Sequence, residues 1–292
     1  MILPVILRLG RVSNLPTVWT NVLAGLALAG GAGAAGPAIT ASLIVALSLL
    51  YVAGMYLNDA FDRDIDAEER PERPIPSGAV DAGTVFGVGF ALITMAIAVL
   101  AVTSYAAPHG TGWYAAAAAA GLAAVIVFYD MNHKSNALGP VVMGACRALV
   151  YVTAAVAVVA APPVDLYIGA GVVWSYVIGL SYIAKQETLG RVANLWPAVF
   201  LAAPLVYCLP TAASGAFGLV VYLVFAVWVA RAIALLVRRR GADVPRAVVG
   251  LIAGICLLDA LLVLGAGGGA MAWIAIALFP VTVLAQRFIP GT

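Results

Sequence analysis

Residues 38–58 read AITASLIVALSLLYVAGMYLN, and residues 59–80 follow as DAFDRDIDAEERPERPIPSGAV. The first segment carries no Asp, Glu, Lys or Arg, and its length matches the about 20 apolar residues that a helix needs to cross a bilayer. The second segment holds seven of the 13 acidic residues of the chain. This junction predicts a membrane helix that is followed by an acidic cluster at the membrane surface.

The composition of the whole chain agrees with a membrane protein. Of 292 residues, 64% are hydrophobic and 10% are charged, and the mean hydropathy is +1.07. A soluble domain has about 25% charged residues, so we expect membrane lipid as the solvent and helices as the spanning elements. The net charge is only +2 and the basic residues form no continuous patch, which excludes nucleic acid as an expected partner.

Apolar segments of spanning length recur along the chain, and we expect ten of them. They lie at approximately 14–35, 38–58, 81–103, 113–129, 137–160, 165–184, 193–210, 216–237, 247–265 and 270–287. The last follows a GAGGG break and is either a full span or an interfacial segment. The predicted fold is an all-α integral membrane protein, a polytopic bundle of nine to ten transmembrane helices that forms one domain over residues 1–292.

Lysine and arginine lie on one side of this bundle if the helices alternate in direction. The opposite loops, which read SYAAPHGTGW, APPVD, PTAASG and GAGGG, contain neither residue. By the positive-inside rule the charged side is cytosolic. We therefore expect a multi-pass protein of the plasma or inner membrane with both termini and the active site facing the cytosol. Ten spans are favoured over nine, because nine would place Arg287 outside.

One amide and three carboxylates share a helical face if the second span continues by two turns, namely Asn58, Asp59, Asp62 and Asp66. Like charges at this spacing repel, and a divalent cation removes that penalty. Mg²⁺ suits such a site because it is usually held by a few carboxylates together with substrate phosphates. Three arginines offer forked donors for phosphate oxygens, namely Arg63, Arg70 and Arg73. The alternative is a solvated charged loop that only fixes the topology.

The pattern N-D-x-x-D-x-x-x-D at residues 58–66, followed by R-P-x-P-S-G at residues 73–78, resembles the first aspartate motif of the UbiA-type intramembrane prenyltransferases. The motif follows the second span, as it does in that family. The polytopic layout agrees with the family along most of the chain.

This resemblance implies an α-helical barrel around a lipid-accessible central cavity. It implies that Asp59, Asp62 and Asp66 are catalytic metal ligands, with Asn58 orienting them, and that Mg²⁺ bridges them to an isoprenyl diphosphate. Ionisation of the diphosphate gives an allylic cation, which a lipophilic or aromatic acceptor captures. The aliphatic cavity would hold the isoprenoid tail, with about 0.8 kcal/mol gained for each buried CH₂. The diphosphate would be held by four basic side chains, namely Arg70, Arg73, Lys134 and Lys185.

The segment SYIAKQETLGR at residues 181–191 departs from the family pattern, which has a second D-x-x-x-D there. Glu187 is its only carboxylate. Tyr182 and Gln186 share a helical face and extend a polar stripe that we expect to bind substrate, with helix–helix contact as the alternative. Our hypothesis is that Lys185 replaces part of the second metal site, since an ammonium neutralises a departing diphosphate without metal.

Other polar side chains also favour a cavity. Asn14 and Asn21 lie seven residues apart in the first span and should face the bundle interior, as substrate contacts or as hydrogen-bonding partners of other helices. The family has Tyr-x-x-x-Lys after the fourth span. Here Tyr129 is followed by His133 and then Lys134. Tyr129 would shield the allylic cation with its ring, while Lys134 would hold diphosphate or extend to the membrane surface.

Two charged residues lie deep within predicted spans. Arg147 is about three turns into the fifth span, where a charge costs about 2.5–3.5 kcal/mol, so it should have a partner or line a wet cavity. We include it among the substrate-binding candidates. Asp259, in the middle of the ninth span, is expected to be a buried neutral carboxyl.

The sequence therefore predicts an Mg²⁺-dependent prenyltransferase, and three alternatives stay open. A non-catalytic protein that binds or flips isoprenoid lipids fits the incomplete second motif. A secondary transporter would place charged sites near the midplane in both halves, whereas this chain has one cluster at the membrane surface. A CDP-alcohol phosphotransferase would also use clustered aspartates, but no D-G-x-x-A-R leader precedes them. Neither the acceptor nor the prenyl chain length can be read from the motif.

Overall fold

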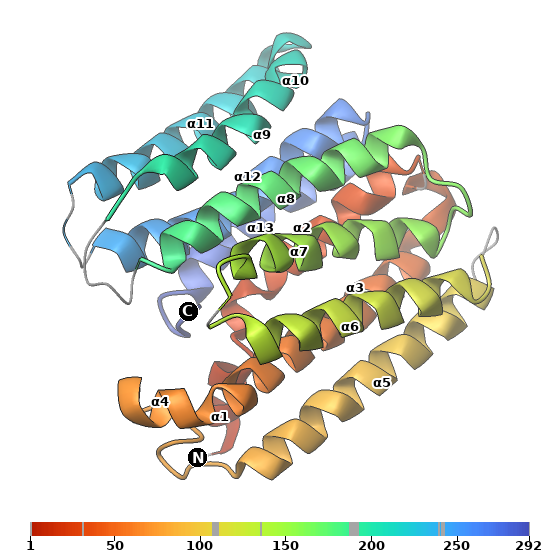
Figure 1. Cartoon of the computed structure of the whole chain (residues 1–292). Helices are drawn as coiled ribbons and strands as arrows, with labels where there is room; N and C mark the ends of the chain where they lie inside the picture. Colours follow the sequence, from red (N-terminus) through yellow and green to blue (C-terminus); the bar gives the residue numbers. More distant parts are fainter. Residues whose placement is uncertain are drawn as a thin grey trace.

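The computed structural model describes residues 2–30, 32–106, 111–134, 136–186, 193–238, 240 and 243–291. Every regular element in these ranges is helical, and the long helices lie side by side in one bundle (Figure 1). The all-α membrane fold is thereby confirmed.

The bounds of the elements are, in chain order, α1 (Ile2–Leu9), η1 (Val12–Asn14), α2 (Leu15–Leu28), α3 (Ala32–Phe61), α4 (Arg63–Glu69), α5 (Ala82–Ala106), α6 (Tyr114–Asn132), α7 (Gly139–Val156), α8 (Val164–Ala184), η3 (Trp196–Leu201), α9 (Ala202–Tyr207), α10 (Leu209–Ala213), α11 (Ala216–Val237), α12 (Asp243–Gly265) and α13 (Gly269–Ala285).

Eight helical segments in the described ranges are long and apolar enough to cross a membrane. One of them, Trp196–Ala213, consists of three short helices in succession. The predicted first and tenth spans are shorter, because α2 has 14 residues and α13 has 17. At about 1.5 Å per residue they extend about 21 and 26 Å, less than the roughly 30 Å of hydrocarbon. The expected count of nine to ten spans is therefore slightly high.

The first predicted span ends early because the chain turns at Gly30, whose φ of 69° lies in the left-handed region that glycine adopts without strain. Helix α3 then contains a break at Gly36, with φ 60° and Pro37 next to it, so its regular spanning part begins after these residues. The segment predicted at 14–35 is thus divided between α2 and the start of α3.

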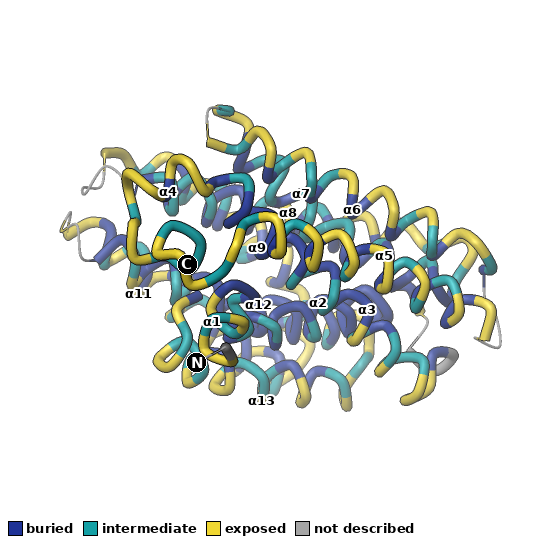
Figure 2. The backbone as a smooth tube through the Cα atoms, turned by 90° about the horizontal axis from the view of Figure 1, so that it is seen from below, coloured by how far each residue is buried: buried dark blue, intermediate teal, exposed yellow. Residues whose placement is uncertain are grey.

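Helices α2 and α12 form the centre of the bundle, and Figure 2 shows them mostly buried within helices that have exposed outer faces. Helix α2 contacts α3, α7, α12 and α13. It approaches α7 closely at Gly25, where an added Cβ would lie 2.6 Å from the backbone oxygen of Tyr151. A larger residue at this position would push apart the two helices that position the polar core.

Both termini, α1 and α4 lie at the same end of the bundle in two perpendicular views (Figures 1 and 2). Asn14 joins the two ends of the chain, because its Nδ2 donates to the backbone oxygen of Gly291 at 2.9 Å and its Oδ1 accepts from Gln286 Nε2 at 3.0 Å. The predicted placement of both termini on one side is consistent with this arrangement. We call this side the α4 end.

Candidate active site at the α4 end

The acidic cluster lies where α3 passes into α4. Asp62 forms a bend between the two helices, yet its amide donates to the Asn58 oxygen at 3.0 Å and the Asp66 amide donates to the Asp62 oxygen at 2.8 Å. Helical phasing therefore continues through the bend, as the sequence predicts. All four residues of the predicted face are buried, with relative exposures of 6% for Asn58, 6% for Asp59, 4% for Asp62 and 1% for Asp66.

Two arginines neutralise this face. Nη1 of Arg73 donates to Asp66 Oδ2 at 2.6 Å and to Asp59 Oδ1 at 3.3 Å. Nη2 of Arg11 contacts Asp59 Oδ1 at 3.0 Å and Asn58 Oδ1 at 3.4 Å. The loop after α4 therefore folds back so that the arginine of the R-P-x-P-S-G segment spans two of the predicted metal ligands.

The end of α6 supplies the partners of the third carboxylate. Asp62 Oδ2 lies 3.3 Å from His133 Nε2 and 3.6 Å from Lys134 Nζ. Lys134 also lies 3.8 Å from Glu69 Oε2. The ring of Tyr129 stacks on that of His133 with centroids 4.8 Å apart. The structure thus brings the predicted residues of α6 and the acidic cluster together.

The donor atoms fit Mg²⁺ in the company of a diphosphate. Within the described ranges no three His, Cys, Asp or Glu side chains converge closely enough to hold an ion by themselves. However, Asp66 Oδ1 is buried without a hydrogen-bond partner among the described residues. Its other oxygen, Oδ2, contacts the guanidinium of Arg73, which a metal ion can displace. Mg²⁺ keeps several non-protein ligands and is commonly bound by one or two carboxylates and substrate phosphates. The cluster therefore suits a site that the substrate completes.

The remaining phosphate-binding candidates occupy different positions. Arg70 ends α4 half-buried, with its amide donating to the Asp66 oxygen at 2.9 Å. Lys185 follows α8, and its Nζ donates to the Asn136 oxygen at 2.6 Å in the loop that follows α6. Partial burial lowers the pKa of Lys185. Glu187, the carboxylate of the incomplete second motif, lies outside the described residues.

The polar stripe predicted on α8 binds other parts of the protein. Tyr182 donates its hydroxyl to the Ala137 oxygen at 3.0 Å. Gln186 donates to the Asn194 oxygen at 3.1 Å and accepts from the amides of Ala193 and Asn194 at 2.7 and 3.0 Å. These contacts fit the helix-contact alternative that the sequence left open, and the substrate-binding role of Tyr182 and Gln186 stays a prediction. The amide of Asn14 likewise makes contacts within the protein, because it holds the C-terminal segment.

A buried polar network lies behind the site. Asp259, with 0% exposure, accepts hydrogen bonds from Thr20 Oγ1, from the Tyr151 hydroxyl and, at 2.8 Å, from Asn21 Nδ2. The oxygen of the same Asn21 amide accepts from Arg147 Nη1 at 2.9 Å. Asn21 therefore links the buried carboxyl of Asp259 to the half-buried guanidinium of Arg147. The hydrogen bond from Asn21 holds Arg147 in position, and the substrate-binding role of both residues stays a prediction.

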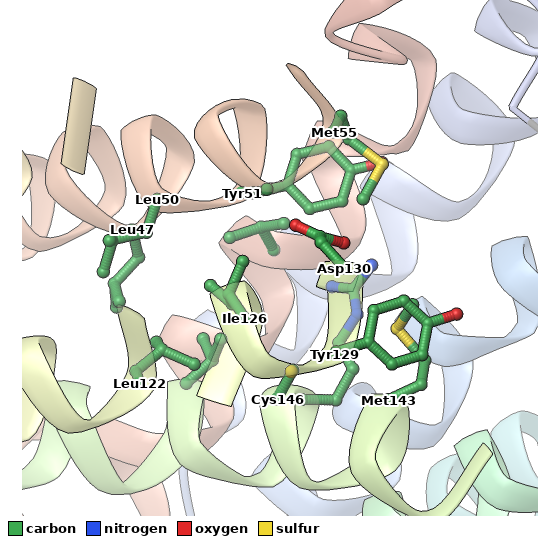
Figure 3. Close-up of a pocket in the computed structure, with 14 residues that line it drawn as sticks. Leu47, Leu50, Tyr51, Met55, Leu122, Ile126, Tyr129, Asp130, Met143 and Cys146 are labelled. Atoms are coloured by element: carbon green, nitrogen blue, oxygen red, sulfur yellow. The ribbon is translucent and has the colours of Figure 1, made fainter. Parts of the chain in front are cut away.

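A pocket with about 580 Å³ of empty space lies between α3, α6 and α7. Figure 3 shows aliphatic side chains at one end, including Leu47 and Leu122, and Tyr51, Tyr129 and Asp130 at the other. We call it the α3–α6–α7 pocket. It provides an apolar chamber directly beside the acidic cluster.

Several residues of the site were not assigned from the sequence. The sequence analysis gives no site role to Arg11, Asp130 or His133; the last two lie in the segment YDMNHK at residues 129–134. Their contacts with the acidic cluster join segments more than 45 residues apart, as the separations of 47 for Arg11–Asn58 and 72 for Asn58–Asp130 show. The local signal was the density of polar residues in YDMNHK at the end of an apolar span.

Comparison with known proteins agrees with this geometry. Residues 18–251 match the model of the UbiA prenyltransferase family. A solved structure superposes on this chain with a TM-score of 0.61. It comes from work on the biosynthesis of digeranylgeranylglyceryl phosphate synthase in membranes. It shares 16% sequence identity and covers 90% of this chain and 98% of its own. At that identity the likeness concerns the fold.

Curated relatives named digeranylgeranylglyceryl phosphate synthase are similar over shorter segments. The protein from Natronomonas pharaonis is 43% identical over 65 residues, which are 22% of this chain and 24% of its own. The one from Ignicoccus hospitalis is 36% identical over 124 residues, 42% of this chain and 36% of its own. The one from Methanothermobacter thermautotrophicus is 54% identical over 48 residues, 16% of each chain. The matched segments thus span well under half of these relatives.

Proposed function

The chain belongs to the UbiA prenyltransferase family, and we propose that it transfers an isoprenyl group from an isoprenyl diphosphate to a lipophilic acceptor in an Mg²⁺-dependent reaction at the α4 end. The observation that carries this proposal is the buried helical face of Asp59, Asp62 and Asp66, which lies beside an apolar pocket. These carboxylates pair with the side chains of Arg11, Arg73 and Lys134, which Mg²⁺ can displace. We further propose that the whole chain is one domain in the plasma or inner membrane and that the α4 end faces the cytosol.

In the reaction, the bond between C1 of the prenyl group and the diphosphate oxygen breaks, and its electron pair leaves with the diphosphate. Bound Mg²⁺ supplies charge neutralisation to that leaving group. Arg73 and Lys134 lie against the aspartates and exchange these contacts for phosphate oxygens, with Arg70 close by at the end of α4. Arginine is suited to this exchange because its fork matches phosphate as well as carboxylate geometry.

The allylic cation that remains needs shielding from water. Tyr129 lines the α3–α6–α7 pocket, so its ring face can stabilise the cation. The acceptor nucleophile then bonds to C1 and loses its proton. Because the relatives are named digeranylgeranylglyceryl phosphate synthase, a geranylgeranyl diphosphate and a glyceryl phosphate acceptor are the first substrates to assay.

The experiment is incubation of detergent-purified protein with labelled prenyl diphosphates and candidate acceptors, with and without Mg²⁺. We expect Mg²⁺-dependent consumption of the diphosphate and a labelled product. A second candidate function, isoprenoid binding without catalysis, is favoured by one observation: Arg73 contacts both Asp59 and Asp66. Binding without consumption of the diphosphate in every combination would establish that second function.

A further inference from the structure

Three exposed arginines lie on α11 and at the start of α12, away from the candidate active site. They are Arg231, Arg238 and Arg246, and we call them the α11–α12 arginine cluster. Helix α11 ends and α12 begins near the end of the bundle that also holds α4 (Figures 1 and 2). The cluster therefore lies where the bundle passes from hydrocarbon to the membrane surface.

One buried carboxylate holds two of these arginines in place. The side chain of Asp243 is 1% exposed, and its Oδ2 lies 3.3 Å from Arg238 Nε while its Oδ1 lies 3.3 Å from Arg246 Nη1. The side chains of the two arginines are 50% and 70% exposed. Because Arg238 is paired through Nε, its Nη groups have no partner in the part of the chain that the structure describes. Asp243 thus positions two guanidiniums and leaves the surface positively charged.

The third arginine lies within a membrane-spanning helix. Arg231 precedes Val237, the last residue of α11, by six residues, which is about 9 Å along the axis. It shares a helix face with the exposed side chains of Val220, Val224 and Val227, so this face contacts lipid. Within the described ranges its guanidinium has no hydrogen bond or ion pair. A charge on a lipid-facing surface is costly unless a polar or anionic group reaches it.

Trp228 fixes the position of Arg231. The guanidinium carbon of Arg231 lies 5.1 Å from the centre of the Trp228 ring, a cation–π contact. Trp228 Nε1 donates to the Gly250 oxygen of α12 at 2.6 Å, and its ring meets that of Phe279 on α13 edge to face with centroids 4.8 Å apart. Tryptophan is enriched where headgroups meet hydrocarbon. Three helices therefore hold Arg231 at the depth of lipid phosphates.

An apolar groove continues from the same face of α11 toward the opposite end of the bundle. Its lining comes from α11, α12 and α13 and includes Phe217, Val220, Val224, Leu257, Trp273 and Ile276. Val224 and Val220 lie about 10 and 16 Å from Arg231 along the helix axis. One leaflet is about 15 Å deep, half of the roughly 30 Å of hydrocarbon. An acyl chain attached to a phosphate at Arg231 is therefore long enough to enter the groove.

We propose that the α11–α12 arginine cluster and the apolar groove together bind one anionic membrane phospholipid, with its phosphate on the arginines and an acyl chain in the groove. The cluster has three guanidiniums and one carboxylate, so its charge complements an anionic headgroup. The groove adds affinity that a free phosphate does not gain. The bound lipid connects α11 with α12 and α13 and stabilises this part of the bundle. The site acts whether or not the protein transfers a prenyl group.

The test compares three lipids on the purified full-length protein by native mass spectrometry. Dioleoyl phosphatidylglycerol is anionic, dioleoyl phosphatidylcholine has the same chains and no net charge, and dihexanoyl phosphatidylglycerol has chains too short for the groove. Each arginine near a membrane surface adds roughly fivefold to the binding of anionic lipid. We expect dioleoyl phosphatidylglycerol to bind at least about tenfold more tightly than either of the others. Its advantage over phosphatidylcholine should shrink as salt is raised.

Variants assign the headgroup preference to the cluster. Arg231→Gln should lose roughly fivefold in affinity for dioleoyl phosphatidylglycerol, and the triple variant Arg231→Gln, Arg238→Gln, Arg246→Gln should bind the two dioleoyl lipids equally. The matched control is Arg287→Gln, because Arg287 is also exposed and follows α13 near the same end of the bundle. This control should keep the preference. Dioleoyl phosphatidylglycerol should raise the melting temperature of the wild type and the control, but not that of the triple variant.

Four outcomes overturn the proposal. Equal binding of the two dioleoyl lipids to the wild type would show a surface that responds only to chains, and this comparison requires no variant to fold. Displacement of the lipid by inorganic phosphate alone would show a site for free phosphate. A preference that survives in the triple variant would place the headgroup elsewhere. A lipid-free dimer that dissociates in the triple variant would show that a second copy of the chain covers this face.

Discussion

Replacing Arg73 with Gln should make the protein bind Mg²⁺ more tightly in the absence of any diphosphate. Arg73 Nη1 lies 2.6 Å from Asp66 Oδ2 and 3.3 Å from Asp59 Oδ1. The Asp66 side chain is 1% exposed and that of Arg73 is 17% exposed, so water screens this contact weakly. Mg²⁺ must displace the guanidinium from both carboxylates before it can bind them.

The size of the effect follows from the contact that is lost. A hydrogen bond to a charged group contributes about 1.5–3 kcal/mol, and each 1.4 kcal/mol is about a tenfold change in affinity. We therefore expect Arg73→Gln to raise the affinity for Mg²⁺ alone by roughly 10- to 100-fold. The same substitution should lower the affinity for prenyl diphosphate in saturating Mg²⁺, because the forked donor for the phosphate oxygens is absent.

The assay is calorimetric titration of the purified protein with Mg²⁺, then with prenyl diphosphate at saturating Mg²⁺. Arg63→Gln is the matched control, because Arg63 belongs to the same charged stretch but pairs with Asp64 on the surface, with side-chain exposures of 43% and 81%. Such exposed pairs contribute about 0–1 kcal/mol, so this variant should resemble the wild type. Unchanged Mg²⁺ affinity in Arg73→Gln would refute the view that the guanidinium occupies the metal position.

Four further predictions address other parts of the molecule. Asp62→Ala should abolish Mg²⁺-dependent binding of prenyl diphosphate with little change in melting temperature; unchanged binding would remove Asp62 from the site. Asp259→Ala leaves three buried donors without their acceptor, so thermal unfolding should show a loss of at least about 1–3 kcal/mol, and a neutral result would refute the network. Lys185→Ala should weaken diphosphate binding more than Glu187→Ala; the reverse order would make Glu187 a metal ligand. A reporter fused after Thr292 should report a cytosolic location, and an external one would invert the topology.

The sequence was most informative where structure depends on local spacing. The shared face of Asn58, Asp59, Asp62 and Asp66 was predicted from helical period alone, and the backbone hydrogen bonds across Asp62 bear it out. Apolar length located the spanning helices for the same reason. Apolar length overestimated the length of α2, because the chain turns at Gly30 before the apolar composition changes.

Partners distant in the chain could not be predicted in the same way. Asn14 has the helical position of a cavity residue, but its amide is taken by Gly291, 277 residues away. The polar face of α8 likewise satisfies loop carbonyls and amides that only the folded chain brings near it. Nothing in the local sequence around Arg11 predicts its contact with Asp59, 48 residues away. Spacing gives the face of a helix, and tertiary packing decides what that face contacts.

The most direct measurement of prenyl transfer is the release of pyrophosphate from labelled geranylgeranyl diphosphate by the purified protein, with oleoyl glycerol phosphate and other acceptors, in Mg²⁺ and in a chelator. We predict release and a labelled product in Mg²⁺, loss of both in the chelator, and loss of both in Asp62→Ala. If the wild type binds the diphosphate and releases no pyrophosphate with any acceptor, the protein is an isoprenoid binder and not a transferase.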